Sequence, residues 1–398
     1  MLDLRSGEAI YIAGAVRTPI GRFGGGLSPL SAPDLGTVAV QAALERSGLP
    51  ADVVGHAILG HGRQAGAGPN PARQVSVRAG IPVEVPAFTV NQACASGMKS
   101  IILGAQSLRL GMADAVVCGG MESMSNTPYM VPSARWGARL GHAELVDGMY
   151  QDGFLCPLCG DLMGRTAERL AERYGIDRTR QDEYAVESQS RGAAAVEAGA
   201  FATETVRVEV PGRKGPRIVE ADEHMRPGAT VQSMAKLKPV FKKDGTVHPG
   251  NSSGITDGAA ALVVVSERVV EKYGLAPQAR ILAATEAGVD PSVMGIGPVP
   301  AVRKMLDGLD MEIGHVDLIE LNEAFAVQVL AVSDELGLDL SRTNVNGGAI
   351  ALGHPIGCTG ARIVVTLIHA MQQRSARTGL ATLCVSGGMG TSLLLERV

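Results

Sequence analysis

The fold of this chain is decided by one stretch, TVNQACASGMKS, which occupies residues 89–100. Residues 85–90 begin before this stretch and run into it; they are mostly apolar and predict a buried strand. Residues 96–110 predict a buried helix. Cys94 then lies on a tight strand-to-helix turn, where unpaired N–H groups and the helix dipole favour a thiolate over a thiol. Two interpretations stay open at this point: a reactive cysteine, or a small buried core residue, the commoner fate of a lone cysteine.

The length and composition indicate a globular protein with more than one core. The chain has 398 residues, 45% of them hydrophobic and 19% charged, so two or three domains are expected. No apolar run approaches the roughly 20 residues needed to cross a bilayer, and residues 1–8 lack signal-peptide and transit-peptide features. We therefore expect a cytoplasmic protein that does not bind membranes. The formal net charge of −4 argues against a nucleic-acid binder.

One segment departs from the acidic average. Residues 207–243 contain nine Lys and Arg residues against four Asp and Glu residues. Such an excess suits a small polyanion such as a phosphorylated cofactor, although a solvated surface is the commoner explanation.

Six cysteines are scattered along the chain, which does not resemble a disulfide framework. Cys156 and Cys159 form a lone CxxC pair without a second pair or a nearby histidine, so a metal site or a redox site is not expected there.

Alternating strand and helix patterns predict an α/β fold with a largely parallel sheet in the first 122 residues. Polar and turn residues dominate residues 123–254, with helices only over 163–174 and 179–198, which indicates an inserted domain. The sheet resumes at residues 260–265. The last third repeats the opening pattern, and both halves have a strand that ends in Gly-Gly-Met, at 119–121 and 387–389, which indicates an internal duplication.

Three further residues are candidates for the same site as Cys94. His354 lies in a glycine-rich stretch, Cys384 lies near the end of a predicted strand just before glycines, and Asn322 follows another strand. Ligands of parallel α/β sheets bind beyond the carboxyl ends of strands, so these residues are expected to converge. Taken singly, His354 is as consistent with a structural histidine as with a catalytic base, and Asn322 is more consistent with a capping residue.

These motifs resemble those of the thiolase family over essentially the whole chain. The matching blocks are NQACASG (91–97), NEAF (322–325), GHPIG (353–357) and CVSGGMG (384–390). The resemblance implies two duplicated α/β halves in a layered αβαβα arrangement. Residues 1–122, completed by about 255–275, would form the first half and residues 276–398 the second. Residues 123–254 would form an inserted loop domain that holds coenzyme A, and the assembly would be a homotetramer built as a dimer of dimers.

The resemblance also implies a role for each site residue. Cys94 would carry the acyl group, with His354 as its base, and Cys384 would move the α-carbon proton. Asn322 would position a water that completes one oxyanion hole with His354, and the N–H groups of Cys94 and Ser386 would form the other. The residues expected to contact coenzyme A are Met163, Arg226, Ser233, Ser253 and Phe325. No cofactor is expected, because the coenzyme A thioester is itself the substrate.

Two residues depart from the family pattern. Ser386 stands where many thiolases have a glycine, and Leu162 stands where short-chain biosynthetic thiolases tend to have histidine. The resemblance nevertheless favours an acetyl-CoA C-acetyltransferase of fatty acid metabolism, which makes or cleaves acetoacetyl-CoA by a ping-pong Claisen condensation. The alternatives are a 3-ketoacyl-CoA thiolase of broader chain length, a decarboxylating ketoacyl synthase, and a non-catalytic acyl-CoA or lipid-binding protein of the same fold.

Overall fold

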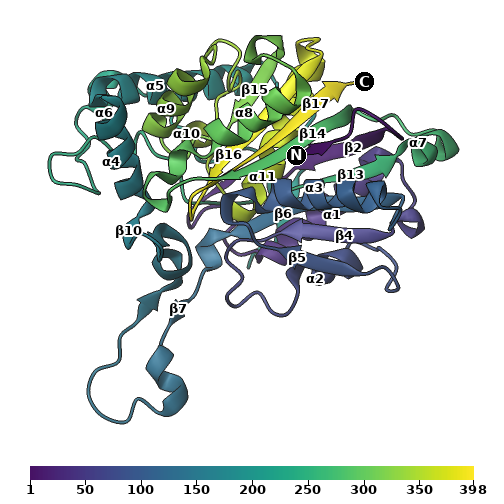
Figure 1. Cartoon of the computed structure of the whole chain (residues 1–398). Coiled ribbons are helices and arrows are strands. Elements are labelled where there is room, and N and C mark those ends of the chain that lie inside the picture. The colour runs from purple at the N-terminus through teal and green to yellow at the C-terminus, as the bar shows by residue number, and fades with distance from the viewer.

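A mixed sheet of 11 strands runs through the computed structural model, which describes all residues from 1 to 398 (Figure 1). Its main path has the order β15 (Leu318–Leu321), β16 (Thr378–Val385), β17 (Met389–Arg397), β14 (Ala279–Gly288), β2 (Ile10–Arg17), β13 (Thr256–Ser266), β6 (Ala115–Ser123), β4 (His56–Gly60) and β5 (Ala87–Val90). The short strands β1 (Leu2–Asp3) and β3 (Gly21–Arg22) pair with β14 and β13.

The strand order repeats on the two sides of the junction between β2 and β14. Outward from β2 the order is β13, β6, β4, and outward from β14 it is β17, β16, β15. The junction itself is narrow, since β2 and β14 pair at only two positions. This repeat agrees with the internal duplication that the sequence predicts.

The expectation of a largely parallel sheet holds where strands of the first 122 residues pair with one another, but it is wrong for the sheet as a whole. Only β4 with β5, β4 with β6, and β15 with β16 run parallel; the other neighbours are antiparallel. The reason lies in the connections. β17 follows β16 after a tight glycine turn, and β13 arrives from the inserted segment rather than from a crossover helix, which parallel pairing requires.

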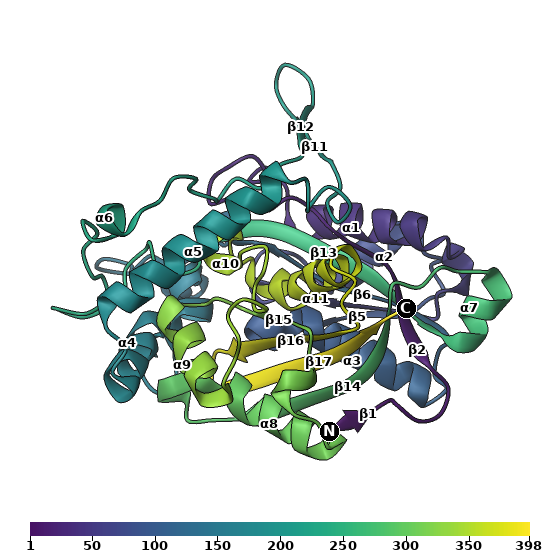
Figure 2. The ribbon, with the colours of Figure 1, turned by 90° about the horizontal axis from the view of Figure 1, so that it is seen from above.

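Helices form three layers around the two halves of the sheet (Figure 2). The central layer holds α3 (Ser96–Arg109) and α11 (Ile356–Gln373), whose apolar residues share one core with the inner faces of both halves. On the outer faces, α1 (Ala32–Ser47) and α2 (Pro71–Arg78) cover the first half, and α8 (Pro298–Leu309) and α9 (Ala326–Leu336) cover the second. Successive residues of the central strands pack alternately into the core around α3 and α11 and into an outer core. This period-2 alternation is expected for a sheet that is buried on both faces.

Local sequence signals explain α1 well and β5 poorly. Ser31 caps α1 in a capping box with Asp34, and Gly48 ends the helix in the left-handed conformation. The strand predicted to be buried before Cys94 is instead β5, the last strand of the sheet, and Phe88 on it is 42% exposed in this chain. Its apolar pattern does not distinguish an edge strand from a central one.

The inserted segment holds α4 (Met163–Tyr174), α5 (Arg178–Glu197), α6 (Val231–Met234) and three two-stranded hairpins. The hairpins are β7 (Tyr129–Met130) with β8 (Val146–Asp147), β9 (Leu155–Cys156) with β10 (Asp161–Leu162), and β11 (Val208–Val210) with β12 (Arg217–Val219). The first hairpin projects from the body as an arm (Figure 1). The exact division of the chain into three domains stays a prediction.

Short helices complete the fold. They are α7 (Glu267–Tyr273), α10 (Ala349–Leu352), a single π turn (Tyr150–Phe154) and the 3₁₀ segments Ala51–Val53, Ala93–Ala95, Met124–Asn126, Pro132–Trp136, Pro291–Ile296 and Ile313–His315. None of the helices combines the length and the hydropathy that crossing a bilayer demands.

The contact between α3 and α11 depends on glycine. A Cβ added at Gly97 would lie 2.6 Å from the backbone N of Ala361, and one added at Gly360 would lie 2.5 Å from the backbone N of Met98. Backbone atoms cannot move aside as a flexible side chain can. These two glycines therefore set the distance between the central helices.

We expect Gly360→Ala to destabilise the protein by about 1–3 kcal/mol, because overpacking against backbone outweighs the better helix propensity of alanine. Gly314→Ala is the matched control, since nothing lies within 4 Å of a Cβ added there. Chemical denaturation of the two variants measures the difference. Equal stability of both variants would contradict the proposed role of the glycine contact.

Candidate active site

The turn that carries Cys94 is held by its neighbours' side chains. Cys94 lies in the 3₁₀ segment that leads directly into α3, and Ala93 before it has a φ of +45°, which is strained for a residue with a Cβ. The Asn91 side chain accepts a hydrogen bond from Ala93 N at 2.9 Å. The Ser96 hydroxyl donates to the Ala93 carbonyl at 2.7 Å and accepts from Gln92 N at 2.9 Å. Asn91 and Ser96 therefore compensate the strain at Ala93 and fix the cysteine.

His354 faces Cys94 from the other half of the molecule. Its Nε2 lies 3.3 Å from Cys94 Sγ, and its Nδ1 lies 2.6 Å from the Thr359 hydroxyl. That hydroxyl donates its own hydrogen to the Pro355 carbonyl at 3.0 Å, so it accepts from the imidazole. Nδ1 then carries the proton, and Nε2 is left as an acceptor for the thiol of Cys94.

Burial keeps this pair uncharged. Burial, together with the positive charges of Arg63 and Arg362, lowers the pKa of His354 to about 3. Burial also raises the pKa of Cys94, and its effect outweighs the opposing N–H group of Ser386 and the charge of Arg63. The expectation that a helix start lowers the pKa of Cys94 is therefore wrong, because desolvation of the thiolate is the larger effect.

Cys384 and Ser386 approach Cys94 from the end of β16. They line a cavity of about 110 Å³ together with Cys94 and His354, which we call the inner cavity. Cys384 is fully buried, and burial raises the pKa of its thiol, with a smaller contribution from neighbouring Cys94. The residues with positive φ here are Gly387 and Gly388, not Ser386. A serine therefore fits at position 386 without strain and still offers its N–H.

A larger cavity of about 590 Å³, the outer cavity, opens beside the inner one. Met163, Ser253, Phe325 and His354 line both cavities, so the two are continuous. Arg226 lines the outer cavity, as does Leu162.

Ser233 lines neither cavity; its hydroxyl closes the capping box of α6 with Thr230. The structure thus brings four of the five residues predicted to contact coenzyme A to the cavities and leaves Ser233 outside.

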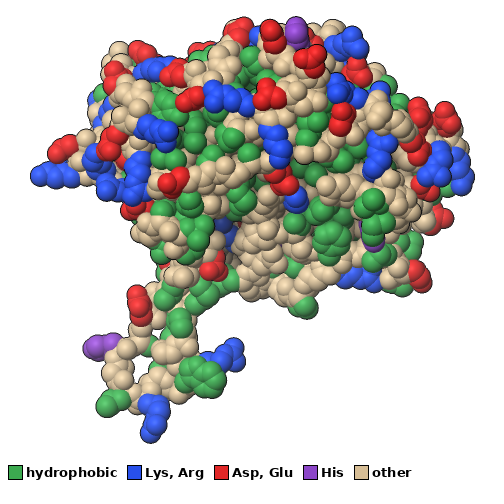
Figure 3. Space-filling view, in the orientation of Figure 1, with side chains coloured by type: hydrophobic (Ala, Val, Ile, Leu, Met, Phe, Trp, Pro, Cys, Tyr) green, Lys and Arg blue, Asp and Glu red, His purple; other side chains and the backbone are tan.

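Arg226 is the one Lys or Arg residue of the basic segment 207–243 that lines the outer cavity. Lys242 pairs with Glu172, and Arg217 donates to the Gly26 carbonyl. The remaining positive side chains are exposed: Arg207, Arg213 and Lys214 lie in or beside the β11–β12 hairpin, and Lys236, Lys238 and Lys243 follow α6. Positive side chains gather at the edge of the molecule beside α4 (Figure 3). Arg22, outside this segment, is a second arginine that lines the outer cavity.

Asn322 is completely buried after β15, and neither polar atom of its side-chain amide has a hydrogen-bond partner in the protein. An unpaired buried amide is unfavourable, so it has capacity to hold a water molecule. The next residue, Glu323, is fixed by hydrogen bonds from Tyr184, Ser188 and Asn344. This network holds the NEAF block rigidly at the strand end.

Arg63 and Glu122 are site residues that no motif in the sequence indicated. Glu122 accepts hydrogen bonds from Gly62 N at 3.0 Å and Gly357 N at 2.8 Å, and its carboxylate lies 3.1 Å from His61 Nε2. It therefore links the two halves directly beside Cys94. The available signal was the run His61-Gly62-Arg63, two ionisable residues directly after a buried strand.

No cluster of three or more His, Cys, Asp or Glu side chains is arranged to hold a metal ion. Cys156 and Cys159 are both free thiols in the β9–β10 hairpin.

Comparison with known proteins identifies the class to which this fold and site belong. The chain matches the thiolase N-terminal domain over residues 10–268 and the thiolase C-terminal domain over residues 275–397. It belongs to the thiolase family.

Full-length relatives make the comparison more specific. The chain is 51% identical to an acetyl-CoA acetyltransferase of Pseudomonas aeruginosa, covering 98% of this chain and 100% of the relative. It is 49% identical to the Escherichia coli enzyme of the same name, with 97% and 98% coverage. Among solved structures, acetyl-CoA acetyltransferase of Bacillus anthracis has a TM-score of 0.96 at 44% identity, covering 98% and 99% of the two chains. Human mitochondrial 3-ketoacyl-CoA thiolase in complex with CoA has a TM-score of 0.95 at 42% identity, covering 98% of each chain.

We expect the rate of Cys94 alkylation by iodoacetamide to rise with pH and to reach half its maximum above pH 9, because the raised pKa of Cys94 delays formation of the thiolate. The plot of alkylation rate against pH should show no second inflection near pH 6–7 from protonation of His354, because the pKa of His354 is about 3. Peptide mass spectrometry assigns the modified cysteine, and Cys94→Ser is the control. A plateau already reached below pH 8 would contradict this electrostatic description.

Proposed function

We propose that this thiolase is an acetyl-CoA acetyltransferase that makes and cleaves acetoacetyl-CoA through an acyl-Cys94 intermediate. The observation that carries the proposal is the meeting of Cys94, His354 and Cys384 around one inner cavity, which opens into a cavity large enough to admit a long ligand. The substrates are acetyl-CoA, acetoacetyl-CoA and CoA. The names of the full-length relatives favour this activity over a broader 3-ketoacyl-CoA thiolase, and the intact trio argues against a non-catalytic binding protein.

In the first half-reaction, Cys94 Sγ attacks the thioester carbonyl while its proton passes to His354 Nε2, the free acceptor 3.3 Å away. The C–S bond to coenzyme A then breaks, and Cys384 gives its proton to the leaving thiolate. The N–H groups of Cys94 and Ser386, which lower the pKa of the Cys94 thiol, stabilise the oxyanion.

In the second half-reaction, the Cys384 thiolate removes a proton from the methyl group of a second acetyl-CoA. The enolate oxygen is stabilised by protonated His354 and by a water held on Asn322. The enolate carbon attacks the acyl group, the bond to Cys94 breaks, and His354 returns its proton to Cys94. All three residues then regain their starting protonation states, and thiolysis follows the same steps in reverse.

We also propose that the enzyme is a cytoplasmic homotetramer, a dimer of dimers, that acts in fatty acid metabolism. The projecting arm supports an assembly, because apolar side chains are visible on it (Figure 3). Trp136 and Leu140, both in the arm, are 81% and 99% exposed. Light scattering after size-exclusion chromatography measures the mass, and a monomeric mass would contradict this part of the proposal.

Radiolabelled acetyl-CoA should label Cys94, because only this residue is proposed to hold the acyl group. Acid quenching followed by peptide mapping locates the label, and Cys94→Ser should retain none as a thioester. A label on another residue of active enzyme would refute the assignment.

Cys384→Ser should slow carbon–carbon bond formation by ~10²-fold or more, because the serine hydroxyl is a far weaker base toward the α-carbon. Exchange of acetyl groups between acetyl-CoA and CoA should be largely retained, since a thiol with a pKa of about 8.5 leaves readily as a thiolate. Steady-state condensation and isotope exchange measure the two reactions. Equal loss of both would show that Cys384 has a different role.

A further inference from the structure

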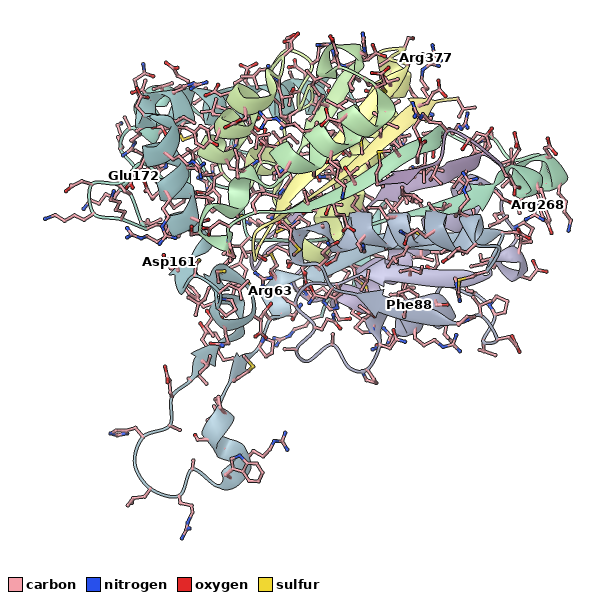
Figure 4. All side chains as sticks on the ribbon, in the orientation of Figure 1. Arg63, Phe88, Asp161, Glu172, Arg268 and Arg377 are labelled. Carbon is pink, nitrogen blue, oxygen red and sulfur yellow. The ribbon has the colours of Figure 1, made fainter.

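The Cys156–Cys159 pair is a dithiol that the proposed mechanism does not use. Cys156 ends β9, and Cys159 lies in the turn that leads to β10. Figure 4 labels Asp161, the first residue of β10, below α4. Both cysteines are free thiols; Cys156 is only 1% exposed, whereas Cys159 is half-buried. The hairpin therefore holds one sulfur that solvent can reach and one that is shielded from it.

The turn between β9 and β10 brings the two cysteines together. Gly160 N donates a hydrogen bond to the Cys156 carbonyl at 2.8 Å, which closes a single helix-like turn over residues 156–160. In a turn of this kind, residues i and i+3 face the same way, with their Cβ atoms roughly 5–6 Å apart. A disulfide needs Cβ atoms about 3.5–4.5 Å apart, so a small contraction of this turn joins the two sulfurs.

The two thiols already influence each other. Burial raises the pKa of Cys159 and the neighbouring Cys156 thiol raises it further, against the opposing effects of the Asp161 N–H group and the Arg169 side chain. Because the thiolate is the form that attacks a disulfide, the raised pKa makes thiol–disulfide exchange slow at neutral pH. Cys159 is the sulfur that an oxidant reaches first, since it is the more exposed of the two.

Both ends of this hairpin carry residues that line the cavities. Phe154 directly precedes β9 and lines both cavities, Leu162 ends β10 and lines the outer cavity, and Met163 follows it and lines both. The tip of the hairpin reaches the glycine turn between β16 and β17, because Leu158 Cδ1 lies 3.9 Å from a Cβ added at Gly387. A contraction of the hairpin turn therefore acts on the wall of the candidate active site.

A bond between these two cysteines is expected to be labile. Stabilisation by a disulfide increases with the size of the loop that it closes, and only Pro157 and Leu158 separate the two cysteines. The half-buried Cys159 sulfur also leaves the bond open to attack by thiols in solution. Both features suit a reversible modification and not a permanent structural link.

We propose that Cys156 and Cys159 form a reversible disulfide that slows turnover at the neighbouring site. The disulfide itself goes beyond the thiolase activity, whereas its effect on turnover rests on the function proposed above. Forming the bond draws the two Cβ atoms together by roughly 1–2 Å. This contraction shifts Phe154, Leu162 and Met163, which line the passage to Cys94.

The oxidant is a low-molecular-weight disulfide such as glutathione disulfide. The Cys159 thiolate attacks one of its sulfurs, the S–S bond of the oxidant breaks, and one glutathione leaves with the proton that Cys159 released. Cys156 then loses its proton and attacks the Cys159 sulfur, and the second glutathione leaves with that proton. Two protein thiols are oxidised and one small disulfide is reduced to two thiols. Excess glutathione reverses both steps.

The bond is tested by equilibrating the wild-type enzyme in buffers with different ratios of glutathione to glutathione disulfide. Free thiols are then blocked with N-ethylmaleimide after denaturation, and tryptic peptides are analysed by mass spectrometry. The tryptic peptide 140–165 contains both cysteines and no other cysteine. We expect this peptide to take up two blocking groups from reducing buffers, and to take up none and lack two hydrogen atoms from oxidising buffers. Equilibration replaces a timed exposure because the raised pKa of Cys159 slows the first attack.

The effect on turnover is measured as the initial rate of acetyl-CoA condensation in the same samples. Condensation is preferred to thiolysis, because thiolysis needs added coenzyme A, a thiol that reduces the bond. We expect oxidation to lower the rate by about tenfold, because a displacement of about 1 Å in a site can cost up to 10²-fold. Cys156→Ser and Cys159→Ser should each keep the rate of the reduced wild-type enzyme and lose the response to oxidation. The double variant Cys156→Ser/Cys159→Ser is the control for oxidation of other cysteines.

Absence of the bond within peptide 140–165 in the most oxidising buffer would overturn the proposal. A bond that forms without changing the condensation rate, or an equal loss of rate in the double variant, would overturn the effect on the site. Absence of condensation by the reduced wild-type enzyme would refute the thiolase function instead, and the peptide mass would still decide whether the disulfide forms.

Discussion

The central helices α3 and α11 approach each other backbone to backbone at Gly97 and Gly360. Cys94 precedes the first of these helices and His354 precedes the second, so the helix contact fixes the 3.3 Å distance between sulfur and imidazole. Glu122 reinforces the same junction, because its carboxylate binds N–H groups from both halves. The site therefore depends on a contact between two halves that otherwise share a narrow strand junction.

Burial then determines the electrostatics of this site. The low polarity around Cys94, His354 and Cys384 favours their neutral forms, so charge arises only as the reaction proceeds. The negative charge that develops on the substrate oxygen in the proposed first half-reaction is stabilised by fixed N–H donors, and not by an imidazolium ion already present at rest. Arg63 is a buried cation in the same cavity; its charge lowers the pKa of Cys94, but the effect of burial is larger.

Much of the site was predictable because its candidate residues lie next to glycine or small residues at the ends of elements. Cys94 follows β5, Cys384 is near the end of β16, and His354 lies between α10 and α11; the structure brings all three around one cavity. Arg63 and Glu122 were missed because an ionisable residue near a strand is commonly solvent-exposed. Ser233 lies outside both cavities, and its contact with coenzyme A stays a prediction.

The sequence by itself determined the order of the main helices and strands, the cap of α1, the repeat of the two halves and the motifs that contain the candidate reactive residues. These features depend on local periodicity, turn residues and short motifs, which act between near neighbours in the chain. Only the tertiary structure decided the strand directions, the exposure of β5 and the raised pKa of Cys94. Each of these depends on what distant segments place around a residue, because desolvation and pairing are set by the packed surroundings and not by the residue's neighbours in sequence.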